Sequence, residues 1–148
     1  MEIAAYYPPV EIKKVETILK QFDTVLVPAL SQRVDIKDYA WKLAQNAVMF
    51  YVHEKEKVLG HCAVYMNNQS CTYISSIAVM PEVQGKGIGR ILWECVEKEA
   101  CIRGISKIKL EVYGKNITAV RFYQEQGCRV ICRKENWLTM IKDLTYML

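Results

Sequence analysis

Residues 79–90 read Val79-Met80-Pro81-Glu82-Val83-Gln84-Gly85-Lys86-Gly87-Ile88-Gly89-Arg90, a loop between two apolar segments. The residues before it, 71–79, have the pattern of a strand, and from Gly87 onward apolar residues recur at helical spacing. Three alternate glycines therefore open a helix shortly after a strand. Glycine has no Cβ, so the backbone N–H groups of such a loop can approach an anion closely, and the helix adds the positive end of its dipole. The stretch predicts a loop that binds a phosphate or pyrophosphate group.

The spacing of these glycines does not match the two most common nucleotide-binding loops. The dinucleotide-binding fingerprint requires a third glycine where this chain has Arg90. The phosphate loop of nucleotide hydrolases requires Ser or Thr after Gly-Lys, whereas Gly87 follows Gly85-Lys86 here and the upstream glycine is missing. A plain glycine-rich turn at the start of a helix is the alternative without a ligand.

Around this loop, the hydrophobic periodicity predicts a mixed α/β domain. Two N-terminal helices are expected, over residues 10–22 and from Asp35 to Ala47, and Asp35 can cap the second. Strands are expected at 48–52, 58–66 and 71–79, then a helix from Gly87 to Gly104, a strand at 107–112, a helix at 116–126 and strands at 128–133 and 137–144. No linker or repeat divides the chain. We therefore expect a single domain over residues 1–148, with a mostly antiparallel sheet and helices on both faces.

The composition is that of an ordinary globular domain, with 148 residues, 51% hydrophobic and 24% charged, and a net charge of +4. The basic residues are scattered, which favours a solvated surface over a nucleic-acid interface. No segment has the pattern of a signal peptide, and no run approaches the ~18 apolar residues of a membrane helix, so we expect a cytoplasmic protein without membrane contact. The six cysteines form no C-x-x-C pair and are expected to be reduced thiols.

The glycine loop resembles that of the GNAT superfamily of N-acetyltransferases, whose pattern is Gln/Arg-x-x-Gly-x-Gly/Ala. Gln84, Gly87 and Gly89 match this pattern, and residues 77–79 and Pro81 precede it as in that family. The later stretch Asn116-Ile117-Thr118-Ala119-Val120-Arg121-Phe122-Tyr123-Gln124-Glu125-Gln126-Gly127 is similar to a second helix of the family. Cys128 departs from the pattern, because an aromatic residue usually follows the closing glycine. The resemblance runs from Met49 to the C-terminus and implies a GNAT-like sheet that splays between the strands at 71–80 and 106–113.

The resemblance also implies acetyl-CoA as the acetyl donor, and no metal. In such enzymes the splay makes a slot for the pantetheine arm, the amides of the glycine loop hold the pyrophosphate, and an asparagine binds from the later helix. Carried onto this sequence, the cofactor-binding residues are Ile77, Ala78, Val79, Gln84, Gly85, Lys86, Gly87, Ile88, Gly89, Arg90 and Asn116. The free backbone groups of Ile77 and Val79 would bind the arm as an added strand would. Lys86 and Arg90 can equally be solvated cations at the start of the helix.

The implied reaction is direct acetyl transfer to a primary amine through a tetrahedral intermediate. The Val79 N–H would stabilise the thioester oxygen, and Tyr123 would protonate the leaving thiolate, since the pKa of a phenol lies close to that of a thiol. Glu111 is the candidate base, because a Glu between Leu and Val has this role in the similar ribosomal-protein N-terminal acetyltransferases. A buried strand would also raise its pKa. A water chain is the alternative base, and both side chains have structural alternatives, Tyr123 as a core aromatic and Glu111 as a pocket-lining or salt-bridged carboxylate.

The acceptor site is expected between residues 6–47 and the last two strands. Its candidate side chains are Tyr6, Tyr7, Asp35, Asp38, Tyr39, Trp41, Glu135 and Trp137. A likeness of residues 38–51 to acetyltransferases of amino sugars favours a small-molecule amine as acceptor. A peptide or protein N-terminus, and a non-catalytic acyl-CoA-binding module, are the alternatives. His53 and His61 are expected to be structural or surface residues, and an exposed last strand can pair with a second copy as a homodimer.

Overall fold

A seven-stranded sheet runs through the computed structural model, which describes residues 1–144 of the chain. In spatial order its strands are β1 (Glu2–Tyr6), β2 (Ala47–Glu54), β3 (Lys57–Tyr65), β4 (Thr72–Val79), β5 (Lys107–Tyr113), β7 (Trp137–Asp143) and β6 (Arg129–Lys134). Neighbouring strands are antiparallel except for β4 and β5, which are parallel.

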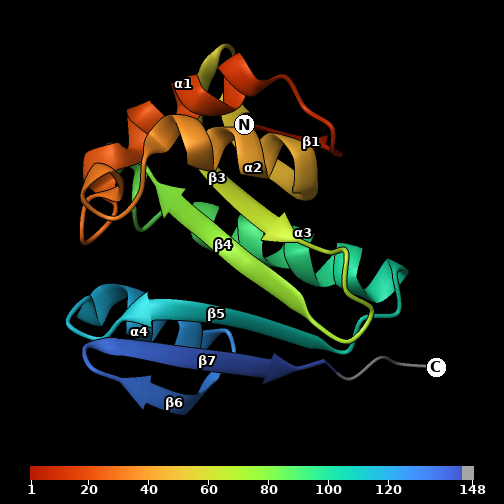
Figure 1. Cartoon of the computed structure of the whole chain (residues 1–148), viewed down its shortest axis with the longest axis vertical. Helices are drawn as coiled ribbons and strands as arrows, with labels where there is room; N and C mark the ends of the chain where they lie inside the picture. The colour runs from red at the N-terminus through yellow and green to blue at the C-terminus, as the bar shows by residue number, and fades with distance from the viewer. Residues whose placement is uncertain (145–148) are drawn as a thin grey trace.

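Two pairs of helices cover the two faces of this sheet (Figure 1). Helices α1 (Ile12–Phe22) and α2 (Ile36–Asn46) lie on one face, and α3 (Ile88–Ile102) and α4 (Ile117–Glu125) lie on the other. Two short 3₁₀ segments, Asp23–Val25 and Leu30–Gln32, lie between α1 and α2, and a third, Pro81–Val83, lies between β4 and α3. Asp35 caps α2 as expected, because its carboxylate accepts a hydrogen bond from the Asp38 N–H at 3.0 Å.

Strand β2 shows how the sequence builds a core on both faces. Its run of six buried residues alternates between the two layers: Val48, Phe50 and Val52 pack towards α3, whereas Met49 and Tyr51 pack towards α1 and α2. A strand covered on both faces needs apolar residues at successive positions, and this run is almost continuously apolar. The sequence of β2 therefore follows from burial on both faces of the sheet, and not from an alternation of apolar and polar residues.

The predicted fold class is confirmed, with two differences in the strands. The N-terminal third was expected to be helical, but it begins with the edge strand β1, which takes its conformation from pairing with β2. The last strand, β7, was expected at an exposed edge; it lies between β5 and β6 because its alternate residues Leu138 and Met140 are buried in the core. The exposed edge at this end of the sheet is β6.

Within the described residues, 1–144, no helix is long and apolar enough to cross a membrane. In the same range, no group of three His, Cys, Asp or Glu side chains is arranged to hold a metal ion. All six cysteines are free, and Cys62 and Cys128 are buried. The last four residues of the expected single domain, 145–148, lie outside the described range.

Candidate active site

The parallel strands β4 and β5 separate after a short contact. Their pairing covers only Thr72 to Ile74 against Ile108 to Leu110. Beyond this point β4 continues beside β3 as far as Val79, and β5 continues beside β7 as far as Tyr113. The splay therefore lies where the resemblance implied it.

The splay leaves backbone groups of β4 without a strand partner. The Met80 N–H donates to the Leu59 carbonyl of the neighbouring segment at 2.8 Å. Because successive peptide groups of a strand point to opposite sides, the N–H and C=O groups of Ile77 and Val79 point away from β3, into the gap on the β5 side. They are placed as an added extended chain would require.

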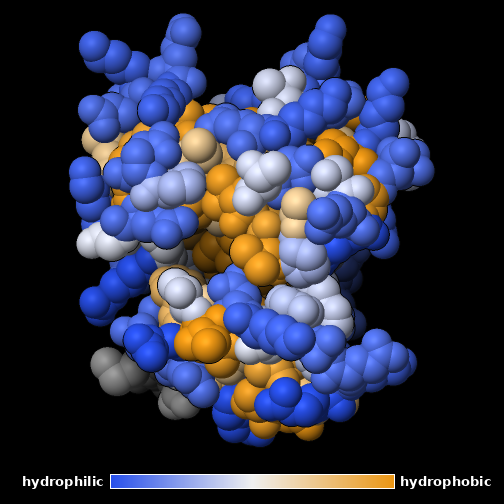
Figure 2. Space-filling view, turned by 90° about the vertical axis from the view of Figure 1, so that its left-hand side faces the viewer, coloured by the Kyte–Doolittle hydropathy of each residue, from blue (hydrophilic) through white to orange (hydrophobic). Residues whose placement is uncertain are grey.

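Two cavities fill this gap, and Figure 2 shows the hollowed face with apolar residues in its depth. The larger has a volume of about 760 Å³ and lies between β4, the glycine loop and α4. The smaller, of about 180 Å³, lies between β4, β5 and the segment that joins α1 to α2. Both are bounded by Ile77, Asn116 and Tyr123, with Leu26, Val27 and Ala119. The two cavities therefore meet where these six residues lie, with Tyr123 among them.

The glycine loop forms one wall of the larger cavity. Gly85 and Gly87 have φ angles of +81° and +85°, in the left-handed region that favours glycine. Gly87 is the N-cap of α3 and has no side chain to cap the helix, and the first helical bond runs from the Ile91 N–H to the Gly87 carbonyl. The N–H groups of the first turn are thus left for a ligand, as an anion site requires.

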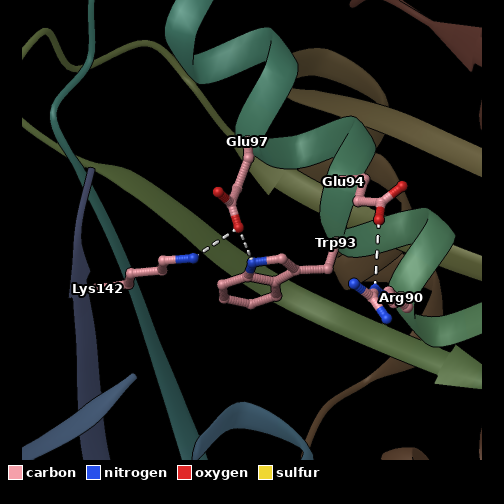
Figure 3. Close-up of polar contacts among 5 residues, drawn as sticks. All are labelled: Arg90, Trp93, Glu94, Glu97 and Lys142. Atoms are coloured by element: carbon pink, nitrogen blue, oxygen red, sulfur yellow. Dashed lines mark hydrogen bonds and ion pairs between the residues drawn. The ribbon is translucent and has the colours of Figure 1, made fainter. Parts of the chain in front are cut away.

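Two polar side chains of this loop, Gln84 and Arg90, have partners within the chain. The Gln84 Nε2 group donates to the Val79 carbonyl at 3.1 Å, so Gln84 ties the loop back to the end of β4 and that carbonyl is not free. Arg90 pairs with Glu94 one turn along α3, at 3.4 Å (Figure 3). Lys86 does not line the cavity, whereas Ala78, Ile88, Gly89 and every other predicted cofactor residue does.

Asn116 is the N-cap of α4 and lines both cavities. Its side-chain oxygen accepts a hydrogen bond from the Ala119 N–H at 3.2 Å. This bond occupies the acceptor end of the amide, so the NH₂ group is the end with which Asn116 can serve a ligand.

Tyr123 is buried, with 7% of its surface exposed, and its ring packs against Trp93 and Phe122 at centroid distances of 6.1 and 5.4 Å. Burial raises the pKa of the Tyr123 phenol, so the side chain carries its proton throughout the neutral range. Trp93 is fixed in turn by a hydrogen bond, because its indole N–H donates to Glu97. Glu97 also accepts a hydrogen bond from Lys142 of β7 at 2.9 Å (Figure 3). This link joins α3, whose Trp93 packs on Tyr123, to β7 on the other side of the splay.

Glu111 lines the smaller cavity, but it is not desolvated as expected. Its flanking residues Leu110 and Val112 are buried on one face of β5, and Glu111 points to the opposite face, where its side chain is exposed. The Tyr73 hydroxyl donates to the Glu111 carboxylate at 2.9 Å. The burial argument for Glu111 as a base is therefore wrong, and its position beside the cavity is what remains in favour of that role.

Of the expected acceptor-site residues, only Tyr39 and Trp137 line the smaller cavity. Asp35 is a helix cap, Tyr6 packs on Tyr51, and Tyr7 donates a hydrogen bond to Glu99 of α3. The lining residues that the sequence reading missed include Val27, Arg33, Tyr73, Ser75 and Tyr113. Alternation along β4 could have found only part of this set: Tyr73 and Ser75 alternate, but a bulge against β3 interrupts the pattern there, and Ile77 packs with the core on the α3 face.

The comparisons with known proteins agree with this geometry. The model of the acetyltransferase (GNAT) family matches residues 12–128, so the chain belongs to this family. It is 34% identical over 67 residues to thialysine N-epsilon-acetyltransferase of Mus musculus, a match that covers 45% of this chain and 39% of that protein. It is 29% identical over 86 residues to a peptidyl-lysine N-acetyltransferase of Escherichia coli (strain K12), covering 58% of this chain and 53% of that protein.

These matches span about two fifths to one half of the length of those relatives. Among solved structures, the fold matches a PaiA N-acetyltransferase of Thermoplasma acidophilum in complex with coenzyme A, with a TM-score of 0.74 and 16% identity. That match covers 97% of this chain and 99% of the other.

Proposed function

We propose that this protein transfers an acetyl group from acetyl-CoA to a primary amine. The observation that carries the proposal is the meeting of two cavities at Tyr123. One cavity has the groups that suit an acyl-CoA, and the other has the polar groups that suit an amine. The family of the chain and the coenzyme A complex of its structural neighbour support the choice of donor.

The larger cavity suits a ligand with a pyrophosphate at one end and an extended amide-containing arm at the other. The free amides at the start of α3 would hold the pyrophosphate, and the outward peptide groups of Ile77 would hold the arm. The Asn116 amide would donate to the same ligand where α4 begins. When bound, acetyl-CoA supplies the acetyl group as a thioester at the Tyr123 end of this cavity.

Two groups of the chain would act on the developing charges. The Val79 N–H would donate to the thioester oxygen as that oxygen gains negative charge. Tyr123, which is protonated at neutral pH, would donate its proton to the sulfur as the carbon–sulfur bond breaks. The attacking nitrogen still has a proton to lose when the amide forms, and the phenolate would take up this proton, directly or through water.

Glu111 is the proposed acceptor of the amine proton, directly or through water. The Tyr73 hydroxyl occupies one of its carboxylate oxygens and orients the side chain, and the carboxylate retains lone pairs for an amine in the smaller cavity. The amine nitrogen, once deprotonated, can attack the thioester carbon from this side.

A thiol-release assay tests the proposal. Acetyl-CoA is incubated with the protein and a panel of amino sugars, polyamines, amino acids and peptides, and the acetylated product is identified by mass. We expect thiol release that requires an amine, and a lower kcat/KM in a Glu111→Gln variant. Tight binding of acetyl-CoA without release for any amine would instead favour a non-catalytic acyl-CoA-binding module. Wild-type turnover in Glu111→Gln would leave a water chain as the base.

A further inference from the structure

The smaller cavity carries charge at two points. Among its described lining residues, Arg33 is the only cation and Glu111 the only anion, and the remaining side chains are apolar, hydroxyl-bearing or amide. The two come from different parts of the fold, Arg33 from the segment between α1 and α2 and Glu111 from β5. A ligand between them would meet a positive and a negative group on separate walls.

Arg33 is held by an aromatic ring rather than by a carboxylate. Its guanidinium carbon lies 4.8 Å from the centroid of the Trp137 ring, which in turn packs on Tyr113 at 5.6 Å. No ion pair involves Arg33 among residues 1–144. Stacking on a ring fixes the plane of a guanidinium and leaves its N–H edge for an oxyanion, which it can bind through two hydrogen bonds.

The charge of Arg33 acts on the tyrosines of the cavity. Burial raises the pKa of Tyr39 to about 12, and the positive charge of Arg33 opposes that rise. Burial and the hydrogen bond to Glu111 raise the pKa of Tyr73, and Arg33 opposes this rise as well. Both tyrosines line the same cavity as Arg33.

We propose that the acceptor is a small amine that also carries an anionic group, a carboxylate or a phosphate, and that Arg33 binds this anion while Glu111 receives the amine. This inference rests on the proposed function and names the substrate class of the same site. The volume of about 180 Å³ lies below the range of drug-sized ligand pockets and suits a molecule of the size of an amino acid.

Matched pairs of amines test the proposal. Glycine, β-alanine and γ-aminobutyrate are compared with their uncharged amides, and phosphoethanolamine with ethanolamine, so that carboxylate and phosphate and their distances from the amine are distinguished. In the wild type we expect kcat/KM to be higher for the anionic member of at least one pair by about tenfold or more, as for a charge-assisted hydrogen-bonded pair.

The Arg33→Gln variant should lose most of this preference, mainly through a higher KM, and Arg33→Lys should keep part of it. Arg121→Gln is the matched control, because Arg121 is an exposed cation of α4 that lines neither cavity. Any of three results would overturn the proposal. The anionic and neutral members of every pair could have equal kcat/KM, or the preference could be unchanged in Arg33→Gln. Peptides could also be preferred over every small anionic amine.

Binding measurements separate this inference from the proposed function. Calorimetric titration of the same pairs into the protein saturated with CoA reports recognition by Arg33 whether or not acetyl transfer occurs. Selective binding of an anionic amine that is lost in Arg33→Gln, without turnover, would support the recognition site and refute the transferase. Turnover without selective binding of an anionic amine would support the transferase and refute the recognition site.

Discussion

His61 is a fully buried histidine of β3 that lines neither of the two cavities. Its ring lies 4.8 Å from the ring of Phe22 of α1, and its Nε2 atom lies 3.5 Å from the Ser76 hydroxyl. The Nδ1 atom has no hydrogen-bond partner within the described part of the chain. Burial lowers the pKa of His61 to about 4, because the charged imidazolium would lose its hydration there.

This burial predicts a stability that depends on pH. The folded-state pKa lies below the unfolded value, so the unfolded state binds a proton first as the pH falls. The contribution of His61 to stability is thus complete above about pH 6.5 and is lost progressively down to about pH 4, up to about 3 kcal/mol in total. We expect urea denaturation to show a smaller loss of unfolding free energy over this range in His61→Leu than in the wild type. A control variant, His53→Gln, removes the other histidine of the chain. Parallel pH profiles for wild type and His61→Leu would contradict the prediction.

The positions of site residues could be predicted where a backbone motif fixes them. Tyr123, Asn116 and the glycines occupy their places because they belong to a helix or a loop with a recognisable pattern. Glu111 was judged from its apolar neighbours in the sequence, and those neighbours lie on the opposite face of the strand. Arg33 was missed because it depends on a contact with Trp137, which is 104 positions away in the chain, counted from residue 33 to residue 137.

The connection between β4 and α3 is the element on which the donor site depends. A side chain at Gly87 would be strained by the positive φ angle, and it would project into open space beside the free amides of α3. Gly104, which follows α3 at its other end, shares both properties, with a φ angle of +71° and no atom within 4 Å of an added Cβ. The two glycines therefore adopt the same left-handed conformation, but only Gly87 lies at the start of α3.

This pair gives a matched test of the anion site. We expect Gly87→Val and Gly104→Val to lose similar stability, about 1–2 kcal/mol each, from the left-handed conformation. Only Gly87→Val should weaken CoA binding, by about tenfold or more, equivalent to about 1.4 kcal/mol. Calorimetric titration with CoA and thermal unfolding provide the two readouts. The anion site would be in the wrong place if Gly87→Val bound CoA as the wild type does.

Elements with a strong internal pattern could be placed from the sequence. The buried stripe Val15, Ile18, Leu19 and Phe22 predicted α1, and the apolar run at 48–52 predicted the strand β2. Strand β1 was missed because it is short and half exposed, and pairing with β2 rather than local preference makes it a strand. The order of β6 and β7 was likewise set by pairing along the full length of β5.

At the scale of the whole molecule, the sheet consists of two parts that share a short parallel contact. The part from β1 to β4 brings the outward backbone groups and the glycine loop, and the part from β5 to β6 brings Glu111 and, through α4, Tyr123. The Trp93–Glu97–Lys142 link joins the two parts behind the gap. The site exists because these parts diverge at Ser75, so no single segment of the sequence contains it.

Turnover of the Tyr123→Phe variant tests this account most directly, because Tyr123 is where the two cavities meet. The variant keeps the ring that packs on Trp93 and removes only the hydroxyl. We expect its affinity for acetyl-CoA to equal that of the wild type and its kcat to fall by about a hundredfold or more, as for the loss of a general acid. Tyr7→Phe, which loses a hydroxyl bound to Glu99 outside both cavities, should turn over as the wild type does. Wild-type turnover in Tyr123→Phe would contradict the account.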